Sequence, residues 1–78
     1  MTGWRTAGEP DHPIRVAIVE AIERIGEPRS AAMLASDLEL HPATVNYHVK
    51  VLVTRGTLTL ASTHRKRNAE ERRYRITE

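Results

Sequence analysis

The sequence of 78 residues has no cysteine and no long apolar segment. Without cysteine, no disulfide can staple the fold and no thiolate can serve a typical structural zinc site. No segment approaches the roughly 18 consecutive apolar residues that a membrane span needs, and residues 1–10 lack the apolar stretch of a signal peptide. We therefore expect a cytoplasmic protein that makes no membrane contact. Its single core must be small, because so short a chain buries only around 60% of its unfolded surface.

Sequence signals of catalysis are missing as well. There is no glycine-rich phosphate loop and no nucleophile motif, and so small a core leaves no room for a deep pocket. The four histidines (His12, His41, His48 and His64) fall on four different predicted segments without an i, i+4 pair, which argues against a metal site. We expect no enzyme, cofactor or metal. For His48 we expect a place at the edge of the core with a local hydrogen bond, the alternative being a phosphate contact.

Charge is divided unevenly along the chain. Residues 1–45 carry four arginines and seven acids, net −3, whereas residues 46–78 carry net +5, so that the whole chain has net +2. This asymmetry suggests an anionic partner for the C-terminal part, with nucleic acid first and a membrane surface second.

The apolar pattern separates an arm from a domain. Residues 1–10 contain two glycines and a proline without an apolar period, and we expect a flexible N-terminal arm there. Its one large apolar residue, Trp4, is expected to be disordered or to lie lightly on the domain, unless it packs on a partner subunit. Residues 11–78 are predicted to form one domain.

Apolar spacing and capping residues predict three helices in this domain. The first starts at Asp11 or His12 and ends at Gly26. The second runs from Ala31 to about Leu38 after Ser30 as N-cap, and the third runs from Pro42 to Arg55 before Gly56. A turn of three to four residues separates the second helix from the third. This is the helix-turn-helix arrangement.

Two short stretches after the third helix alternate with period two and predict antiparallel strands, Thr57 to Leu60 and Arg73 to Ile76. The polar, basic segment from Ser62 to Glu71 is interpreted as a loop too long for a two-residue turn, with Glu70 and Glu71 as solvated charges. Packed on the three helices, the hairpin would close the core with four side chains, namely Leu58, Leu60, Tyr74 and Ile76.

The third helix has a core side and an outward side. At 100° per residue, the outward side collects Ala43, Tyr47, Lys50 and Thr54, flanked by Thr44, Asn46 and Val51. Threonine can contact a thymine methyl or a phosphate, asparagine can pair with adenine, and lysine can reach guanine acceptors or phosphate. No acid occurs between Thr44 and Arg55. A nucleic-acid-binding helix is favoured over a plain solvent-facing one, which remains the alternative.

Three stretches together resemble the ArsR-type winged-helix regulators. They are Asp11-His12-Pro13-Ile14-Arg15, the run from Met33 to Leu52, and Arg72 to Thr77. The most specific piece is Ala43-Thr44-Val45-Asn46-Tyr47-His48-Val49 followed by Leu52. Relatives often have glycine where Glu39 stands, and serine or threonine where His41 stands. Full-length members commonly dimerise through flanking helices, so a homodimer is one expectation and a monomer is the alternative.

The resemblance implies a mainly α fold with a small β-hairpin, a winged helix-turn-helix with a three-helix bundle and a two-stranded antiparallel wing. It implies a repressor-like transcriptional regulator whose helix 42–55 enters the major groove of double-stranded DNA while the wing, 62–73, holds phosphates. The expected helix contacts are Ala43, Thr44, Asn46, Tyr47, Lys50 and Thr54. The expected wing contacts are His64, Arg65, Lys66, Arg67, Arg72 and Arg73.

Two alternatives remain. One is a winged-helix protein-interaction module that docks another regulator without reading bases, which Val51, Val53 and Trp4 would favour. The other is non-specific or RNA binding, although the sequence lacks the exposed aromatic pairs needed for stacking on single strands.

Overall fold

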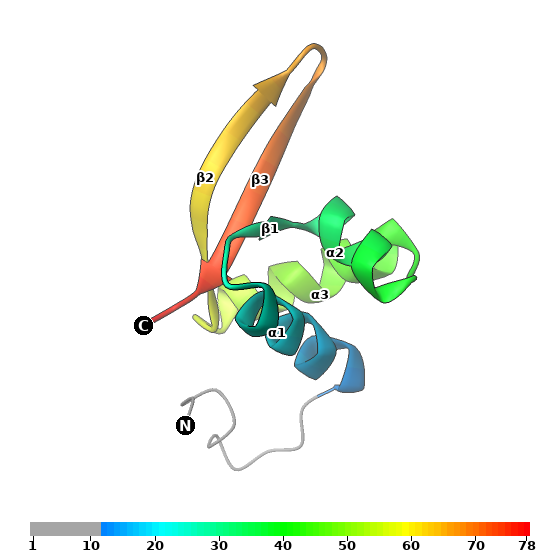
Figure 1. The fold of residues 1–78 in the computed structure, drawn as a ribbon, viewed down its shortest axis with the longest axis vertical. Helices are drawn as coiled ribbons and strands as arrows, with labels where there is room; N and C mark the ends of the chain where they lie inside the picture. Colours follow the sequence, from blue (N-terminus) through cyan, green and yellow to red (C-terminus); the bar gives the residue numbers. More distant parts are fainter. Residues whose placement is uncertain (1–11) are drawn as a thin grey trace.

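The computed structural model describes residues 12–78, which form three helices and a three-stranded antiparallel sheet (Figure 1). This is the predicted winged helix-turn-helix architecture. The predicted arm, residues 1–10 with Trp4, lies outside the described residues, so the division into arm and domain stays a prediction. The elements in chain order are α1 (Pro13–Ile25), β1 (Arg29–Ser30), α2 (Ala31–Leu38), α3 (Pro42–Thr54), β2 (Leu58–Lys66) and β3 (Ala69–Ile76).

The helix ends agree with the capping residues in the sequence. His12 caps α1, where its Nδ1 accepts from the Ile14 amide at 3.1 Å. Ser30 caps α2 through its Oγ, which accepts from the Met33 amide at 3.1 Å. After α1 and α3 the chain turns at Gly26 and Gly56, whose φ angles of 80° and 84° suit glycine because it has no Cβ.

The core lies where the three helices meet the base of the hairpin. It consists of ten buried apolar residues: Ile18, Val19, Ala21, Ile22, Leu34, Ala35, Val45, Val49, Leu52 and Leu58. Tyr74 and Ile76 are partly buried against it, as predicted. The prediction that Leu60 joins the core is wrong: no residue of β2 after Leu58 is buried, and Leu60 is 47% exposed.

The sheet has one strand more than the predicted hairpin. β1 pairs with β3, with Arg29 opposite Tyr74 and Ser30 opposite Arg73, so the strand order is β1-β3-β2. The two-residue β1 carries too short a pattern to be recognised in the sequence. Pairing with β3 fixes the wing to the start of α2.

The predicted loop from Ser62 to Glu71 is wrong. Both strands continue through it, and Lys66 pairs with Ala69 across a turn whose two central residues are Arg67 and Asn68. The turn lacks the glycine that marks most short hairpins in a sequence. Between Leu60 and Ser62 the register shifts, which leaves one extra residue in β2. The hairpin is thus long and extends beyond the helices (Figure 1).

No helix within residues 12–78 is long and apolar enough to cross a membrane.

Candidate nucleic-acid interface

The turn between α2 and α3 fixes the direction of α3. Glu39 adopts a left-handed conformation with φ 56° and ψ 46°, and the amide of Leu40 donates to the carbonyl of Ala35 at 2.9 Å. This 6→1 bond is the Schellman closure of a helix end. His41 then caps α3, since its Nδ1 accepts from the Ala43 amide at 3.2 Å. Glu39 therefore takes the left-handed turn position where relatives often have glycine, and His41 takes the N-cap position where they have serine or threonine.

The outward side of α3 carries the predicted side chains. Ala43, Asn46, Tyr47, Lys50 and Thr54 are exposed, and Tyr47 is 62% exposed. Thr44 is only partly buried, which agrees with its flanking position. The surface offers an amide, a phenol, hydroxyls and an ammonium group without a carboxylate, a set that suits base edges and phosphates.

His48 lies on the inner side of α3 and is 6% exposed. Its Nδ1 is 3.2 Å from the Arg15 guanidinium, and its ring centroid is 4.5 Å from that of His12. A guanidinium can only donate, so Nδ1 of His48 accepts this hydrogen bond and carries no proton. His48 therefore joins α3 to the start of α1, as expected for a histidine at the edge of the core.

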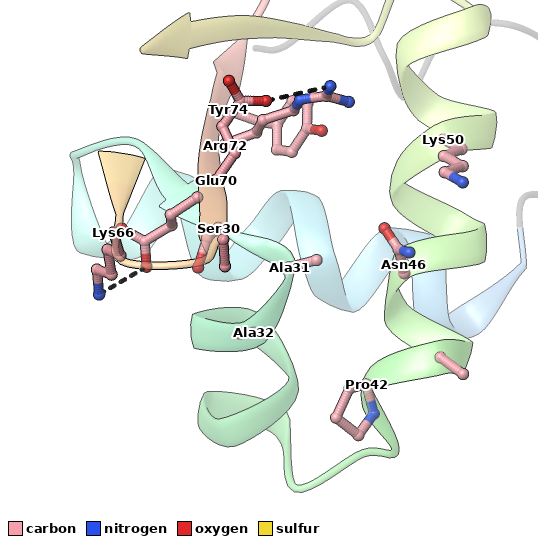
Figure 2. A pocket seen from close by; sticks show the side chains of 13 residues that line it. Ser30, Ala31, Ala32, Pro42, Asn46, Lys50, Lys66, Glu70, Arg72 and Tyr74 are labelled. Atoms are coloured by element: carbon pink, nitrogen blue, oxygen red, sulfur yellow. Dashed lines mark hydrogen bonds and ion pairs between the residues drawn. The ribbon is translucent and has the colours of Figure 1, made fainter. Parts of the chain in front are cut away.

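An open pocket of about 630 Å³ separates α3 from the wing. On the α3 side it is lined by Ala43, Asn46 and Lys50, and on the β3 side by Glu70, Arg72 and Tyr74. Figure 2 shows Arg72 and Tyr74 extending from β3 toward the side of α3 that carries Asn46 and Lys50. Lys66 and Glu71 of the wing also line the pocket, as do Ser30, Ala31 and Ala32 at the start of α2. The helix and the wing thus present one concave surface.

The strand register decides which wing residues share a face. Arg65 is opposite Glu70, and Thr63 is opposite Arg72, on one face of the hairpin, from which Glu70 and Arg72 line the pocket. His64 is opposite Glu71 on the other face, where its Nε2 is 3.2 Å from Oγ of Ser62, and Glu71 and Lys66 of that face also line the pocket. Each face of the hairpin therefore combines basic residues with one acid.

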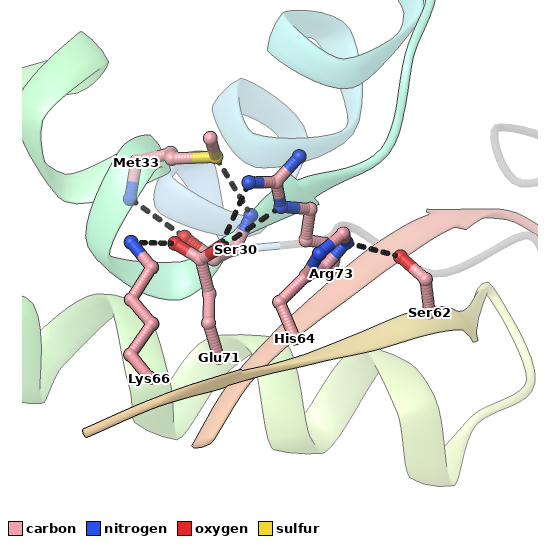
Figure 3. Close-up of polar contacts among 7 residues, drawn as sticks. All are labelled: Ser30, Met33, Ser62, His64, Lys66, Glu71 and Arg73. Atoms are coloured by element: carbon pink, nitrogen blue, oxygen red, sulfur yellow. Dashed lines mark hydrogen bonds and ion pairs between the residues drawn. The ribbon is translucent and has the colours of Figure 1, made fainter. Parts of the chain in front are cut away.

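Glu71 is bound to two cations of the wing. Its Oε1 accepts from Nε and Nη2 of Arg73 at 3.0 and 2.9 Å, and its Oε2 is 3.7 Å from Nζ of Lys66 (Figure 3). The Glu71 side chain is only 16% exposed, so the expectation of a solvated charge in a loop is wrong for this residue. The hydrogen bonds from Arg73 hold the pKa of Glu71 below its ordinary value of 4.5 against the opposing effect of desolvation.

The remaining predicted wing contacts differ in their partners. Arg72 lies 3.4 Å from Glu70, and both side chains are largely exposed. Arg65 and Arg67 are exposed and make no ion pair with another residue of 12–78. Sequence reasoning found the cations but missed their pairing with Glu70 and Glu71. Two of these ion pairs join residues i and i+2 of β3, so strand alternation alone would reveal them, but the sequence pattern predicts a loop in this segment.

Comparison with known proteins agrees with this geometry. A model of a helix-turn-helix domain family matches residues 11–59, which include α1, α2, the turn and α3. No curated protein matches the chain. The match covers more than half of the sequence and supports DNA as the partner. The chain belongs to the helix-turn-helix domain family, and its fold adds the wing to that motif.

Proposed function

We propose that the protein is an ArsR-like transcriptional regulator that binds double-stranded DNA sequence-specifically and acts as a repressor. In this proposal α3 enters the major groove, which is about 12 Å wide and admits a helix. The wing holds the phosphate backbone. One observation carries the proposal: exposed residues of the acid-free side of α3 (Ala43, Asn46 and Lys50) and residues of the basic wing line the same open pocket.

The chemistry of the groove supports separate roles for the two elements. Asn46 suits adenine N6 and N7, while Thr44, Tyr47 and Thr54 can contact methyl groups, sugars or phosphates. Arg65 and Arg67 bring positive charge that is not paired with another described residue, which favours phosphate binding. Arg73 differs from them, since its guanidinium is already bound to Glu71.

One observation favours a protein-interaction module as the second candidate. Val53 near the end of α3 is 38% exposed, and an apolar side chain on an outward helix suits a protein partner. The basic wing and the acid-free helix face favour DNA binding. The protein-interaction module is the alternative, and a DNA-binding experiment must distinguish the two.

Lys50 provides a test of the helix contact. We expect Lys50→Ala to weaken binding to duplex DNA. If Lys50 contacts only a phosphate, all sequences weaken about equally and the slope of log K against log salt becomes shallower by about 0.9. If Lys50 contacts a base, discrimination at one position of the site relaxes instead. Fluorescence anisotropy of labelled duplexes over a range of salt concentrations measures both quantities.

Arg24→Ala is the matched control, because Arg24 is an exposed cation on α1 that does not line the pocket. The control should leave the salt slope unchanged. If Lys50→Ala behaves like Arg24→Ala in affinity, slope and discrimination, Lys50 is not part of the interface.

A further inference from the structure

Glu70 lies in the pocket between the wing and α3, where the proposed function brings the anionic DNA backbone. Its Oε1 is 3.4 Å from Nη2 of Arg72, and Arg65 is its direct partner on β2. Directly opposed residues of an antiparallel pair share a face of the sheet. This carboxylate of the pocket therefore shares a face of the hairpin with two cations, Arg65 and Arg72.

Folding alone does not explain this carboxylate. The side chains of Glu70 and Arg72 are 47% and 60% exposed, whereas that of Glu71 is 16% exposed. Glu71 also accepts two hydrogen bonds from Arg73. An exposed ion pair contributes little to stability because water already solvates both groups. The two adjacent acids thus differ in exposure and bonding. Glu71 is bound within the wing, whereas the Glu70 carboxylate is accessible to a ligand.

A phosphate that approaches Arg72 meets the Glu70 carboxylate beside it. If Arg72 exchanges Glu70 for the phosphate, an unpaired carboxylate is left next to DNA and repels it. If the ion pair persists, Arg72 is already neutralised and adds little to counterion release. In both cases Glu70 opposes phosphate binding whatever the base sequence is.

We propose that Glu70 is a specificity-determining residue, which suppresses binding to DNA of arbitrary sequence by neutralising Arg72. This inference rests on the proposed function and refines it. Because Glu70 neutralises Arg72, the wing binds DNA phosphates only weakly when the base sequence is not the correct one. A stable complex then depends on the contacts that α3 makes with the bases.

The test uses Glu70→Gln, which removes the charge and keeps the size of the side chain. The control is Glu23→Gln, which removes an exposed carboxylate on α1 outside the pocket. We expect Glu70→Gln to bind a random-sequence duplex at least about threefold more tightly at physiological salt, where exposed charges are only partly screened. The salt slope should steepen by about 0.9, as expected for one additional phosphate contact. Glu23→Gln should leave the slope unchanged.

A double-mutant cycle assigns the effect to Arg72. Arg72→Gln should change the salt slope little in the wild-type chain, but in the Glu70→Gln background it should remove the whole additional 0.9. The inference is overturned if Glu70→Gln binds like Glu23→Gln, or if Arg72→Gln flattens the slope equally in both backgrounds.

The two proposals fail in different ways. A wild-type chain that binds no duplex overturns the proposed function and this inference together. A wild-type chain that binds duplex DNA, with Glu70→Gln indistinguishable from Glu23→Gln, overturns the inference alone.

Discussion

Glu39 is the one non-glycine residue with positive φ among residues 12–78, at 56°. A β-carbon in the left-handed region meets the following carbonyl, which strains the backbone. The conformation persists because the amides of Glu39 and Leu40 close the end of α2 with the carbonyls of Ala35 and Ser36. The turn that orients α3 therefore carries a local energetic cost.

Replacement of this residue by glycine should stabilise the protein. Glycine adopts positive φ without the steric penalty, although it also makes the unfolded chain more flexible. We expect Glu39→Gly to raise the free energy of unfolding by on the order of 1 kcal/mol. Urea denaturation measures it. Gly26→Ala, at φ 80°, is the opposite control and should destabilise the protein. A Glu39→Gly variant that is less stable than the wild type would contradict the claim that the backbone is strained at Glu39.

At the scale of elements, the helices could be predicted because their signals are local. Ser30 and Gly56 mark helix ends within a few residues of the helices they limit, and the 3.6-residue period identified the outward side of α3 correctly. The sheet could be predicted only in part. The ends of β2 and β3 depend on pairing between residues that are distant in the sequence. β1 is a strand only because its two residues pair with β3.

The ion pairs of Glu71 with Arg73 and Lys66 give the wing a pH dependence. The folded protein holds the pKa of Glu71 below its ordinary value of 4.5, so the deprotonated form is favoured by folding. The stabilisation is present above about pH 4.5 and is lost as the pH falls through the lowered pKa of the folded state. Glu71→Gln should remove this contribution.

Urea denaturation of the wild type and Glu71→Gln, from about pH 7 down to about pH 2, measures the contribution. We expect the wild type to be the more stable protein at neutral pH, with the difference shrinking as Glu71 becomes protonated. Glu70→Gln is the control, because its carboxylate is largely exposed. A difference between wild type and Glu71→Gln that stays constant over this range would show that Glu71 is not stabilised by its charge.

At the scale of the whole molecule, the fold gathers the basic residues of the C-terminal part on the wing and α3. The basic C-terminal part forms the wing and much of α3, and it frames a pocket that the N-terminal part lines at the start of α2 and at the start of α3. The sequence could predict the outward side of α3 and the cations of the wing. It could not predict the concave surface between them, because Tyr74, Arg72 and Asn46 come together only through the fold.

Sequence-specific reading of duplex DNA by α3 is the central claim, and selection of bound duplexes from a random pool at physiological salt tests it most directly. We expect enrichment of a defined site, and Asn46→Ala should relax the preference at one position of that site. Half-sites about one helical turn apart would indicate a symmetric dimer, and a single short site a monomer. A pool that returns without any enriched sequence would contradict the account and favour the protein-interaction module.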